Sequence, residues 1–493
     1  MEIVGARKLD EERGKGVIDR QEIMDFAREM GLDPNVIEKD YVLGWLLAGI
    51  SNHPAFGSEW IFKGGTCLKK CFFETYRFSE DLDFTITNPH HLDQELLTAA
   101  FREVVQWVYD QAGIEMPVDR IRFKSYENIR GKISVEGKIG YRGPLQRRGD
   151  PPRVKLDLTN DEILVLEPLL REVHHPYSDR PEDGIHVLCY CFEEVFAEKL
   201  RALAERERPR DLYDVVHLFH LDQMRPERSV LMAALEKKCS FKGMGIPSLA
   251  MLENRPERAE LEAEWENMLA HQLPALPSFE KFWQEVPALL DWLHGAVPEK
   301  LPPPIPVTVE IDLSWQPPPM AQTWNTPVPL EIIRFAASNR LCVDLAYEGR
   351  RRLIEPYSLR RTRDGDLLLY AVKRETGDIR SYRVDRIQGA VPTSVSFVPR
   401  YRIELTPSGP ASAPSTARQS GGFKVSKADT AGSTHIRAGR SRAFGTGPTY
   451  VIQCSYCGKR FNRKEYDTRL RQHKDKQGYP CPGRSGYLVE TKY

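Results

Sequence analysis

Hydrophobic and polar positions along the chain change their period several times, and each change predicts a different kind of element. Helical spacing of apolar residues covers residues 21–53, 91–112 and 192–220, with further helices to about residue 297. Short alternating or β-branched runs predict strands at residues 60–62, 82–86, 121–123, 131–135 and 153–158. A sheet followed by a helical half is typical of an α+β domain, here residues 1–297.

The remainder of the chain predicts four further segments, so we expect a multidomain protein. Residues 298–328 are rich in proline and predict a stiff connector, because proline cannot join a strand ladder. Residues 329–406 show short alternating strands, typical of a small β-barrel. Residues 407–449 are rich in Ser, Gly, Pro and Ala and predict a disordered basic tether. Residues 450–493 form a compact cysteine- and histidine-bearing module.

Composition is that of a globular protein, but its charge is unevenly distributed. The 493 residues are 41% hydrophobic and 28% charged, and the formal net charge is zero. Residues 406–493 nevertheless carry 16 Lys and Arg against 5 Asp and Glu, a net charge of +11. A basic end of this kind predicts an anionic partner, with nucleic acid the first candidate. The charged N-terminus and the lack of a run of about 18 apolar residues predict a cytoplasmic protein without a membrane span.

Asp81 and Asp83 carry the first candidate chemistry. Residues i and i+2 of a strand share a face, so both carboxylates project together while Leu82 and Phe84 face a core. Two carboxylates on one rigid strand suit Mg²⁺, which leaves coordination positions open for substrate phosphates. The preceding residues Lys63, Gly64, Gly65 and Thr66 predict a phosphate cradle, because glycine lets the backbone approach a triphosphate.

Other polar residues extend this candidate site, each with an alternative role. Asp157 alternates with apolar neighbours and is either a third metal ligand or a solvent-facing strand residue. Lys199 interrupts the apolar stripe of helix 192–203, so its ammonium either binds phosphate or reaches the edge of the helix. Asp211 and Asp214 lie one turn apart. Each of them is predicted to orient either Lys199 or the acceptor. The alternative role of Asp211 is to cap its helix.

Arg77 and Ser79 lie just before the aspartate pair. Arg77 is either a clamp for phosphate or a surface arginine. The Ser79 hydroxyl either hydrogen-bonds a phosphate or ends the turn. Together with the carboxylates and glycines, these residues predict a metal-dependent nucleotidyltransferase site, in which charge neutralisation and positioning supply the catalysis.

Four motifs together resemble the AbiEii/AbiGii nucleotidyltransferase toxin family of the polymerase-β-like superfamily. They are KGGT, RFSEDLDF, AEKLRAL and RPRDLYDV, and the resemblance covers roughly residues 15–295. It implies a toxin or antiphage enzyme that uses NTP and Mg²⁺; relatives add nucleotides to tRNA 3′ ends and so block aminoacylation. The family residues carry over to Ser79, Asp81, Asp83, Lys199 and the Arg210–Asp211 pair, with the last acidic residue matching Asp211 or Asp214.

The same resemblance implies a separate antitoxin as partner. In some members of the family the antitoxin is a kinase that modifies the active-site serine. Ser79 is the counterpart of that serine in this sequence.

Residues 330–405 resemble a WYL domain, an SH3-like barrel of bacterial regulators and defence proteins. The resemblance rests on YEGRRRLIEPYSL and RSYRVDRI. Several arginines of this segment predict a basic groove for nucleic acid or nucleotide, or alternatively surface ion pairs with nearby acidic residues. The arginines are Arg350, Arg352, Arg380, Arg383 and Arg386; the acidic residues are Glu348, Glu355, Asp378 and Asp385.

Cys454, Cys457, His473 and Cys481 predict a structural zinc site. The Cys-x2-Cys spacing is that of a zinc knuckle, and four ligands close the coordination sphere. Basic and aromatic residues between the ligands suit phosphate contact and base stacking, as in nucleic-acid-binding zinc fingers. Protein binding, to an antitoxin or a phage trigger, is the alternative role.

We therefore expect a defence toxin that transfers nucleotides from NTP to RNA, with the tRNA 3′ end as acceptor. Nucleotidyl transfer to protein (AMPylation) uses the same donor site and is one alternative. The other is a regulator that senses nucleotide and binds nucleic acid through its WYL-like and zinc modules.

Overall fold

The computed structural model describes residues in two compact units, 1–421 and 422–493, which we treat separately. The described residues are 18–73, 76–128, 130–221, 225–253, 257–296, 302–307, 309–312, 330–405, 449–454, 459–463, 470–471, 473–474, 480–481 and 486–492.

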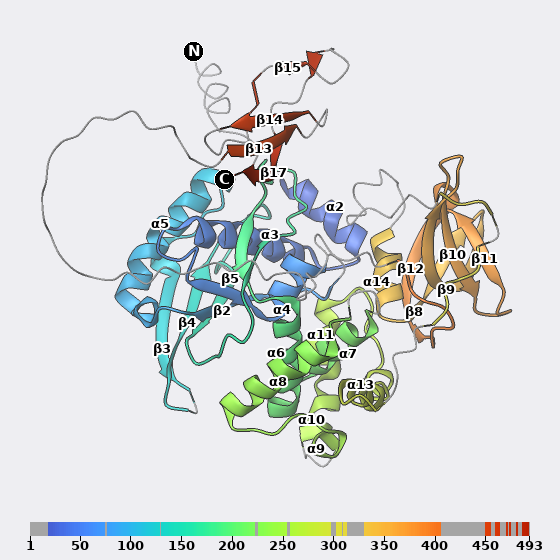
Figure 1. Ribbon diagram of the computed structural model, residues 1–493, viewed down its shortest axis with the longest axis horizontal. Coiled ribbons are helices and arrows are strands. Elements are labelled where there is room, and N and C mark those ends of the chain that lie inside the picture. The colour runs from blue at the N-terminus through green and yellow to red at the C-terminus, as the bar shows by residue number, and fades with distance from the viewer. Residues whose placement is uncertain are drawn as a thin grey trace, which may run out of the picture. The chain divides into compact units, whose positions relative to one another are not determined.

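A seven-stranded mixed sheet is the centre of the first domain (Figure 1). Its strand order is β3-β4-β5-β2-β1-β7-β6. The strands are β1 (Trp60–Lys63), β2 (Asp81–Ile86), β3 (Ile121–Glu127), β4 (Ile133–Gly140), β5 (Arg153–Thr159), β6 (Leu169–Glu172) and β7 (His186–Cys189). Strand β2 runs antiparallel to β1 and parallel to β5, so residues distant in the sequence become neighbours.

The predicted strands of this sheet are confirmed, with one correction and two additions. The predicted strand at 131–135 begins later, at Ile133, and continues to Gly140. Gly131 instead lies in the turn before it, with φ +70° and its N–H donating to the Asn128 carbonyl. Strands β6 and β7 were not predicted, because each is only four residues long and too short for a clear periodicity.

Helices cover the sheet and then continue as a helical half. Figure 1 shows α3 (Pro34–Asn52) and α5 (Gln94–Ala112) packed side by side, with α2 (Arg20–Met30) against α3. Two short helical turns, α4 (Gly64–Cys67) and η1 (Leu68–Phe72), follow β1 directly. The helical half comprises α6 (Phe192–Arg206), α7 (Pro209–His220), α8 (Arg228–Lys242), α9 (Leu249–Glu253), α10 (Glu257–Ala263), α11 (Trp265–Leu269), α12 (Phe279–Trp283) and α13 (Val286–Leu293).

The predicted continuous helix 192–220 is in fact two helices. Glu207 ends α6 in the left-handed conformation, with φ +42°, and Pro209 opens α7. Proline at the first helical position starts a helix well but cannot continue one. The break lets α7 fold back against α6, which brings acidic residues of α7 beside Lys199 of α6.

An antiparallel five-stranded sheet follows, with order β11-β10-β9-β8-β12. Its elements are α14 (Leu330–Ser338), β8 (Leu341–Tyr347), β9 (Arg350–Arg361), β10 (Leu367–Lys373), β11 (Ile379–Arg383) and β12 (Ile387–Ser396). The short strands agree with the alternating pattern predicted for residues 329–406, whereas the helix α14 was not predicted. Among the described residues no ladder joins the edge strands β11 and β12, so the predicted barrel is seen as an open sheet.

The described parts of the proline-rich connector lie along this sheet. Ile305 is buried with Tyr357 and Phe397, and the Arg402 N–H donates to the Pro303 carbonyl at 2.8 Å. Ile311 forms a bridge with Thr362. These pieces of the connector are therefore packed against the five-stranded sheet and the segment that follows it rather than spanning open solvent.

The second unit contains two small sheets. Strands β13 (Thr449–Cys454), β14 (Arg460–Arg463) and β17 (Gly486–Lys492) pair in the order β14-β13-β17. Strand β15 (His473–Lys474) pairs with β16 (Pro480–Cys481), which places His473 opposite Cys481. Almost all of the predicted tether 407–449 and the predicted zinc ligand Cys457 lie outside the described residues.

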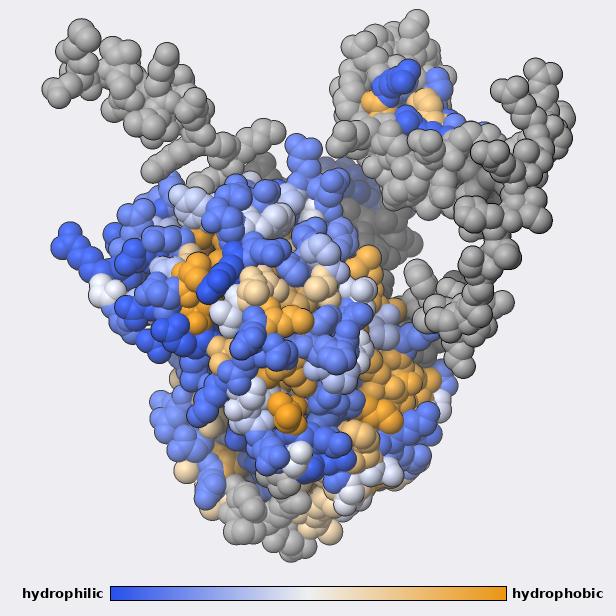
Figure 2. All heavy atoms as spheres, turned by 90° about the vertical axis from the view of Figure 1, so that its left-hand side faces the viewer, coloured by the Kyte–Doolittle hydropathy of each residue, from blue (hydrophilic) through white to orange (hydrophobic). Residues whose placement is uncertain are grey.

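On the face shown in Figure 2, hydrophilic residues predominate and hydrophobic residues come through in separate patches. In the described part of the chain, no helix combines the length and apolar character that crossing a membrane requires.

A buried ion pair joins α3 to the segment after the glycine turn. Lys70 and Asp40 are both buried, and the Lys70 ammonium lies 2.6 Å from the Asp40 carboxylate. Burial opposes ionisation of Asp40, but Lys70, Lys69 and a hydrogen bond from Tyr177 lower its pKa below the usual value. The pair thus holds a charge inside the protein that neither partner could carry alone.

We expect Lys70→Ala to lower the free energy of unfolding by about 3–5 kcal/mol, because Asp40 is left buried without a counter-charge. Chemical denaturation of the full chain measures this. The control is Arg28→Ala, which removes the exposed Arg28–Asp25 pair and should leave stability nearly unchanged. Equal effects of the two substitutions would contradict the assigned role of the buried pair.

Candidate active site

Three carboxylates meet on neighbouring strands of the first sheet. Asp81 and Asp83 lie on β2, and the parallel register with β5 sets Asp83 opposite Asp157. Leu82 and Phe84, between and after them, are fully buried on the other face. The alternation predicted from sequence is therefore present, and strand pairing adds Asp157 to the same face.

The strand register arranges these side chains in two polar rows. One row runs across β1, β2, β5 and β4 as Lys63, Asp83, Asp157 and Glu136. The next row sets Asp81 opposite Lys155. Carboxylates thus lie beside one another at the centre, with Lys63 at one end of their row and Lys155 in the row beside them.

Repulsion among the carboxylates is visible in their ionisation. Burial and the neighbouring Asp157 raise the pKa of Asp83 to about 6, although Lys63 opposes the shift. Burial also raises the pKa of Asp81, while Lys155 and Lys39 counteract it. A divalent cation would supply the positive charge that these groups lack, and three carboxylates are the hard oxygen donors that Mg²⁺ prefers. The residues present therefore fit a magnesium site.

Lys155 was not predicted as part of the site. Its ammonium donates to Asp157 Oδ2 at 2.8 Å and lies 3.5 Å from Glu136. It therefore holds one Asp157 oxygen in place. A signal was present in the sequence, because Lys155 precedes Asp157 by two positions of a strand and so shares its face.

The glycine turn lies directly against the carboxylates. Gly64 has φ +80°, and a Cβ on it would stand 2.2 Å from Asp83 Oδ2. A Cβ on Gly65 would stand 2.6 Å from Arg77 Nη2 and 3.2 Å from Ser79 Oγ. Only glycine fits at either position, so the backbone reaches the site as closely as a phosphate cradle requires.

The other two residues of the predicted cradle are anchored to the protein. The Thr66 hydroxyl donates to the Asp81 carbonyl at 2.5 Å, which ties the turn to β2. The Lys63 ammonium lies 3.4 Å from Glu198 and over the ring of Tyr190. Lys63 therefore links the first row of the sheet to α6.

Lys199 points inward to the acidic residues of α7. Its ammonium lies 2.8 Å from Asp214 and 3.8 Å from Asp211. The alternative in which it extends to the helix edge is therefore not what the structure shows. Arg206, not predicted, donates from Nε and Nη2 to Asp211, at 2.7 Å and 2.9 Å. Arg208 rather than Asp211 stands at the N-cap position of α7.

Arg77 is not a surface arginine, so that alternative is wrong. It is buried, and its Nε and Nη2 donate to Asp214 at 2.6 Å and 2.8 Å. Its Nη1 donates to Gln272 at 2.9 Å. Burial opposes ionisation of Asp214, but Arg77 and Lys199 hold its pKa well below the usual value. Arg77 thus fixes Asp214, which in turn positions Lys199.

Arg210 stands close to the strand carboxylates. Asp81 and Glu80 are among the charges that act on it, while burial and the neighbouring Arg77 lower its pKa. Its Nε has no hydrogen-bond partner among the described residues.

Gln272, which helps to hold Arg77, was not predicted as part of the site. It lies almost two hundred positions after Arg77, so no local pattern in the sequence indicates the contact.

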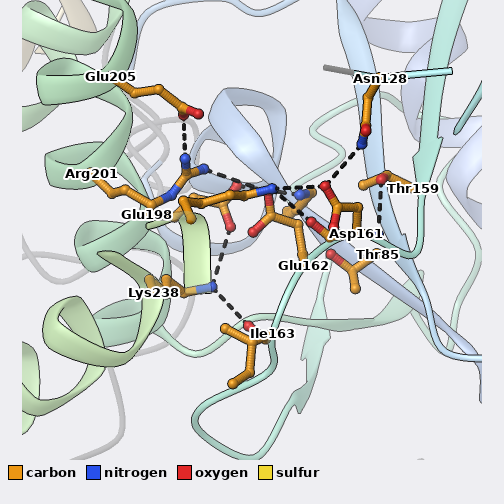
Figure 3. Close-up of polar contacts among 12 residues, drawn as sticks. Thr85, Asn128, Thr159, Asp161, Glu162, Ile163, Glu198, Arg201, Glu205 and Lys238 are labelled. Atoms are coloured by element: carbon orange, nitrogen blue, oxygen red, sulfur yellow. Dashed lines mark hydrogen bonds and ion pairs between the residues drawn. The ribbon is translucent and has the colours of Figure 1, made fainter. Parts of the chain in front are cut away.

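A buried layer of charges holds α6 against the sheet. Figure 3 shows Arg201 of α6 pointing toward Glu162, in the segment after β5, at 3.5 Å. Lys238 of α8 lies 2.9 Å from Glu194 and 3.4 Å from Glu198. Because every member of this layer is paired, α6 has a fixed position, and so does Lys199 upon it.

The C-terminal candidate ligands also come together in the second unit. One ligand atom each of Cys454, His473 and Cys481 lies within 4.8 Å of the others, and the two sulfurs are 3.8 Å apart. His473 Nδ1 lies 2.9 Å from the Arg471 carbonyl, to which it can only donate. That tautomer leaves Nε2 as the nitrogen that could bind a metal.

The predicted basic groove of the WYL-like segment is largely paired. Three of its arginines form surface ion pairs, as the alternative interpretation predicts. The pairs are Arg380–Asp378, Arg383–Asp385 and Arg386–Glu348. Arg352 donates to the Tyr347 carbonyl. Arg350 is exposed at the start of β9. Glu355 is buried and pairs with Arg374 and Arg400 instead.

Two family models match the chain. Residues 45–291, just over half of its length, match the model described as the nucleotidyl transferase AbiEii toxin of a type IV toxin–antitoxin system. Residues 329–392 match the WYL domain. Both resemblances noted in the sequence are thereby confirmed. No curated protein matches the chain.

Two solved structures are similar to parts of the chain. One is MenT4, a nucleotidyltransferase toxin from Mycobacterium tuberculosis H37Rv, at 19% identity and TM-score 0.33, covering 56% of this chain and 99% of that one. The other is JHP933 from Helicobacter pylori, at 15% identity and TM-score 0.35, covering 54% of this chain and 94% of that one.

Gly64→Ala should displace the Asp83 carboxylate and weaken divalent cation binding about tenfold or more. The added Cβ meets Asp83 Oδ2, and the left-handed backbone adds strain of about 1–3 kcal/mol. Titration with Mn²⁺, a paramagnetic substitute for Mg²⁺, measures the affinity. Gly131→Ala is the matched control, because it has φ +70° but nothing within 4 Å of its Cβ. Unchanged Mn²⁺ affinity in Gly64→Ala would refute the close approach.

Proposed function

Because the chain belongs to the AbiEii nucleotidyltransferase toxin family, we propose that its first domain transfers a nucleotide from NTP to RNA, at the 3′ end of tRNA. The transfer would require Mg²⁺ and would block translation by preventing aminoacylation. The observation that carries this proposal is the register of β2 and β5, which gathers Asp81, Asp83 and Asp157 beneath the Gly64 turn. Carboxylates at a glycine turn suit a metal-bound triphosphate.

Each residue of the site has a stated task in this proposal. Asp81 and Asp83, with Asp157 as third ligand, hold Mg²⁺, which when bound neutralises phosphate charge and activates the attacking oxygen. Lys155 keeps Asp157 oriented. Gly64, Gly65 and Thr66 form the wall along which the triphosphate lies.

Cations on the helices complete the phosphate site. Lys199, held by Asp214 and Asp211, faces the triphosphate, and Arg210 adds a second cation near Asp81. Arg77, whose Nε and Nη2 donate to Asp214, fixes the carboxylate that positions Lys199 in this scheme. Lys63 tethers the cradle to α6 through Glu198.

The remaining modules would serve recognition and control. We propose that Cys454, Cys457, His473 and Cys481 bind a structural Zn²⁺ and that the basic module around them contacts RNA. The WYL domain would sense a ligand or phage trigger. A separate antitoxin is the expected partner, and Ser79 at the cradle is the residue that a kinase antitoxin would modify.

Asp83→Asn should reduce nucleotide incorporation by at least about a thousandfold, because the metal loses a charged ligand at the reacting phosphate. Its stability should not fall, since a carboxylate that repels Asp157 is removed. The assay supplies each α-labelled NTP with Mg²⁺ and purified total tRNA to the full chain. Asp119→Asn, on the exposed surface, is the control and should keep full activity.

The location of the label separates the alternatives. Label on tRNA with wild type and not with Asp83→Asn supports the proposal, and removal of the terminal nucleotides locates it at the 3′ end. Label on protein would establish AMPylation instead. No label with any NTP, together with tight binding of nucleic acid, would favour the nucleotide-sensing regulator.

Cys481→Ser should remove one equivalent of zinc and weaken RNA binding about tenfold or more, while Asp83-dependent transfer to a short acceptor is retained. Elemental analysis and filter binding of the full chain measure the two effects. Cys239→Ser, a buried thiol on α8, is the matched control. If Cys481→Ser retains its zinc, the ligand assignment is wrong; if its RNA affinity is unchanged, the module does not recruit RNA.

A further inference from the structure

Three cysteines of the first domain converge behind the glycine turn. Cys67 ends α4, Cys71 lies four residues later in η1, and Cys189 ends β7. All three side chains are fully buried, and their sulfurs lie within 4.8 Å of one another. Strand pairing brings this about, since Cys189 is opposite Phe62 of the strand that leads into the turn.

Buried cysteines often act only as small apolar side chains, so convergence alone needs a second observation. Here two buried cations accompany the thiols. Arg171 of β6 is buried, donates from Nε to the Cys71 carbonyl at 2.9 Å and lies over the ring of Phe72. Lys70, beside Cys71 in the chain, is also buried, with its ammonium on Asp40. Positive charge near a group of thiols favours their thiolate forms.

We propose that Cys67, Cys71 and Cys189 form a binding site for a thiophilic metal ion, distinct from the Mg²⁺ and C-terminal sites. A metal–sulfur bond of about 2.3 Å sets the sulfurs of a trigonal site about 4 Å apart, which the observed spacing permits. Soft thiolate ligands select Cu(I) or Zn²⁺. Among the described residues no fourth cysteine, histidine or carboxylate joins the group, which favours three-coordinate Cu(I).

The site would tie the cradle to the sheet. A metal shared by these thiols would join α4 and η1, which span Gly64 to Phe72, to β7. Strand β7 is the neighbour of β1 in the sheet. Since Thr66 of the same turn donates to the Asp81 carbonyl, the ion would stabilise the segment that positions the carboxylates. The metal therefore has a structural role, and transfer chemistry does not pass through it.

The test measures metal content of the full chain in a background that lacks the C-terminal site. Cys454→Ser, Cys457→Ser and Cys481→Ser together define that background. Protein is expressed with added copper or with added zinc, purified without oxygen, and analysed for metal per chain. Cys71→Ala and Cys189→Ala are then added singly, and Cys239→Ala serves as the matched buried control.

We expect one metal ion per chain in the background and in Cys239→Ala, and none in folded Cys71→Ala or Cys189→Ala. X-ray absorption should show a shell of sulfur only. Copper retention identifies Cu(I), and retention of zinc alone supports the site with Zn²⁺ as its ion. The folded background protein without metal in either medium would overturn the proposal, as would metal retained by both alanine variants.

Burial supplies a second measurement that does not depend on substitutions in the cluster. Because all three thiols are shielded from solvent, a chelator should leave the metal in place until the protein is denatured. Rapid removal from the folded chain would contradict a site at this position.

Discussion

Mutual repulsion of Asp81, Asp83 and Asp157 is the constraint on which the first domain depends. Strand pairing sets Asp83 and Asp157 directly opposite each other, and the raised pKa of Asp83 is the consequence. A fold that holds three carboxylates together, with lysines that only partly offset their repulsion, gives up stability for function and keeps them in place through rigid surroundings. Lys155 on the sheet and the glycine turn above it supply that rigidity.

In the helical half, cations rather than carboxylates are gathered close together. Lys199 and Arg77 converge on Asp214, which is buried and strongly ionised for that reason. Paired charges between α6, α8 and the segment after β5 hold this wall against the sheet. Cations and carboxylates thus face each other from separately stabilised elements. A triphosphate with its metal fits such an arrangement, because it brings both signs of charge.

Local sequence patterns predicted much of this domain. The strand at Asp81, the helix around Lys199 and the glycine turn all have strong periodicity or a residue with one conformational use, and all were found where expected. Short strands such as β6 and β7 lacked enough residues for a period. The burial of Arg77 could not be predicted because its partners, Asp214 and Gln272, are remote in sequence, and no local pattern reports a distant counter-charge.

The sequence by itself determined that Asp81 and Asp83 share a face, that Gly64 forms a turn, and which families the chain resembles, because these depend on neighbouring residues alone. Only the tertiary structure decided that Asp157 stands opposite Asp83 and that Cys189 meets Cys67 and Cys71. Periodicity specifies which face of an element a side chain occupies. Which elements become neighbours depends on packing of the whole core, and burial and pKa follow from that packing.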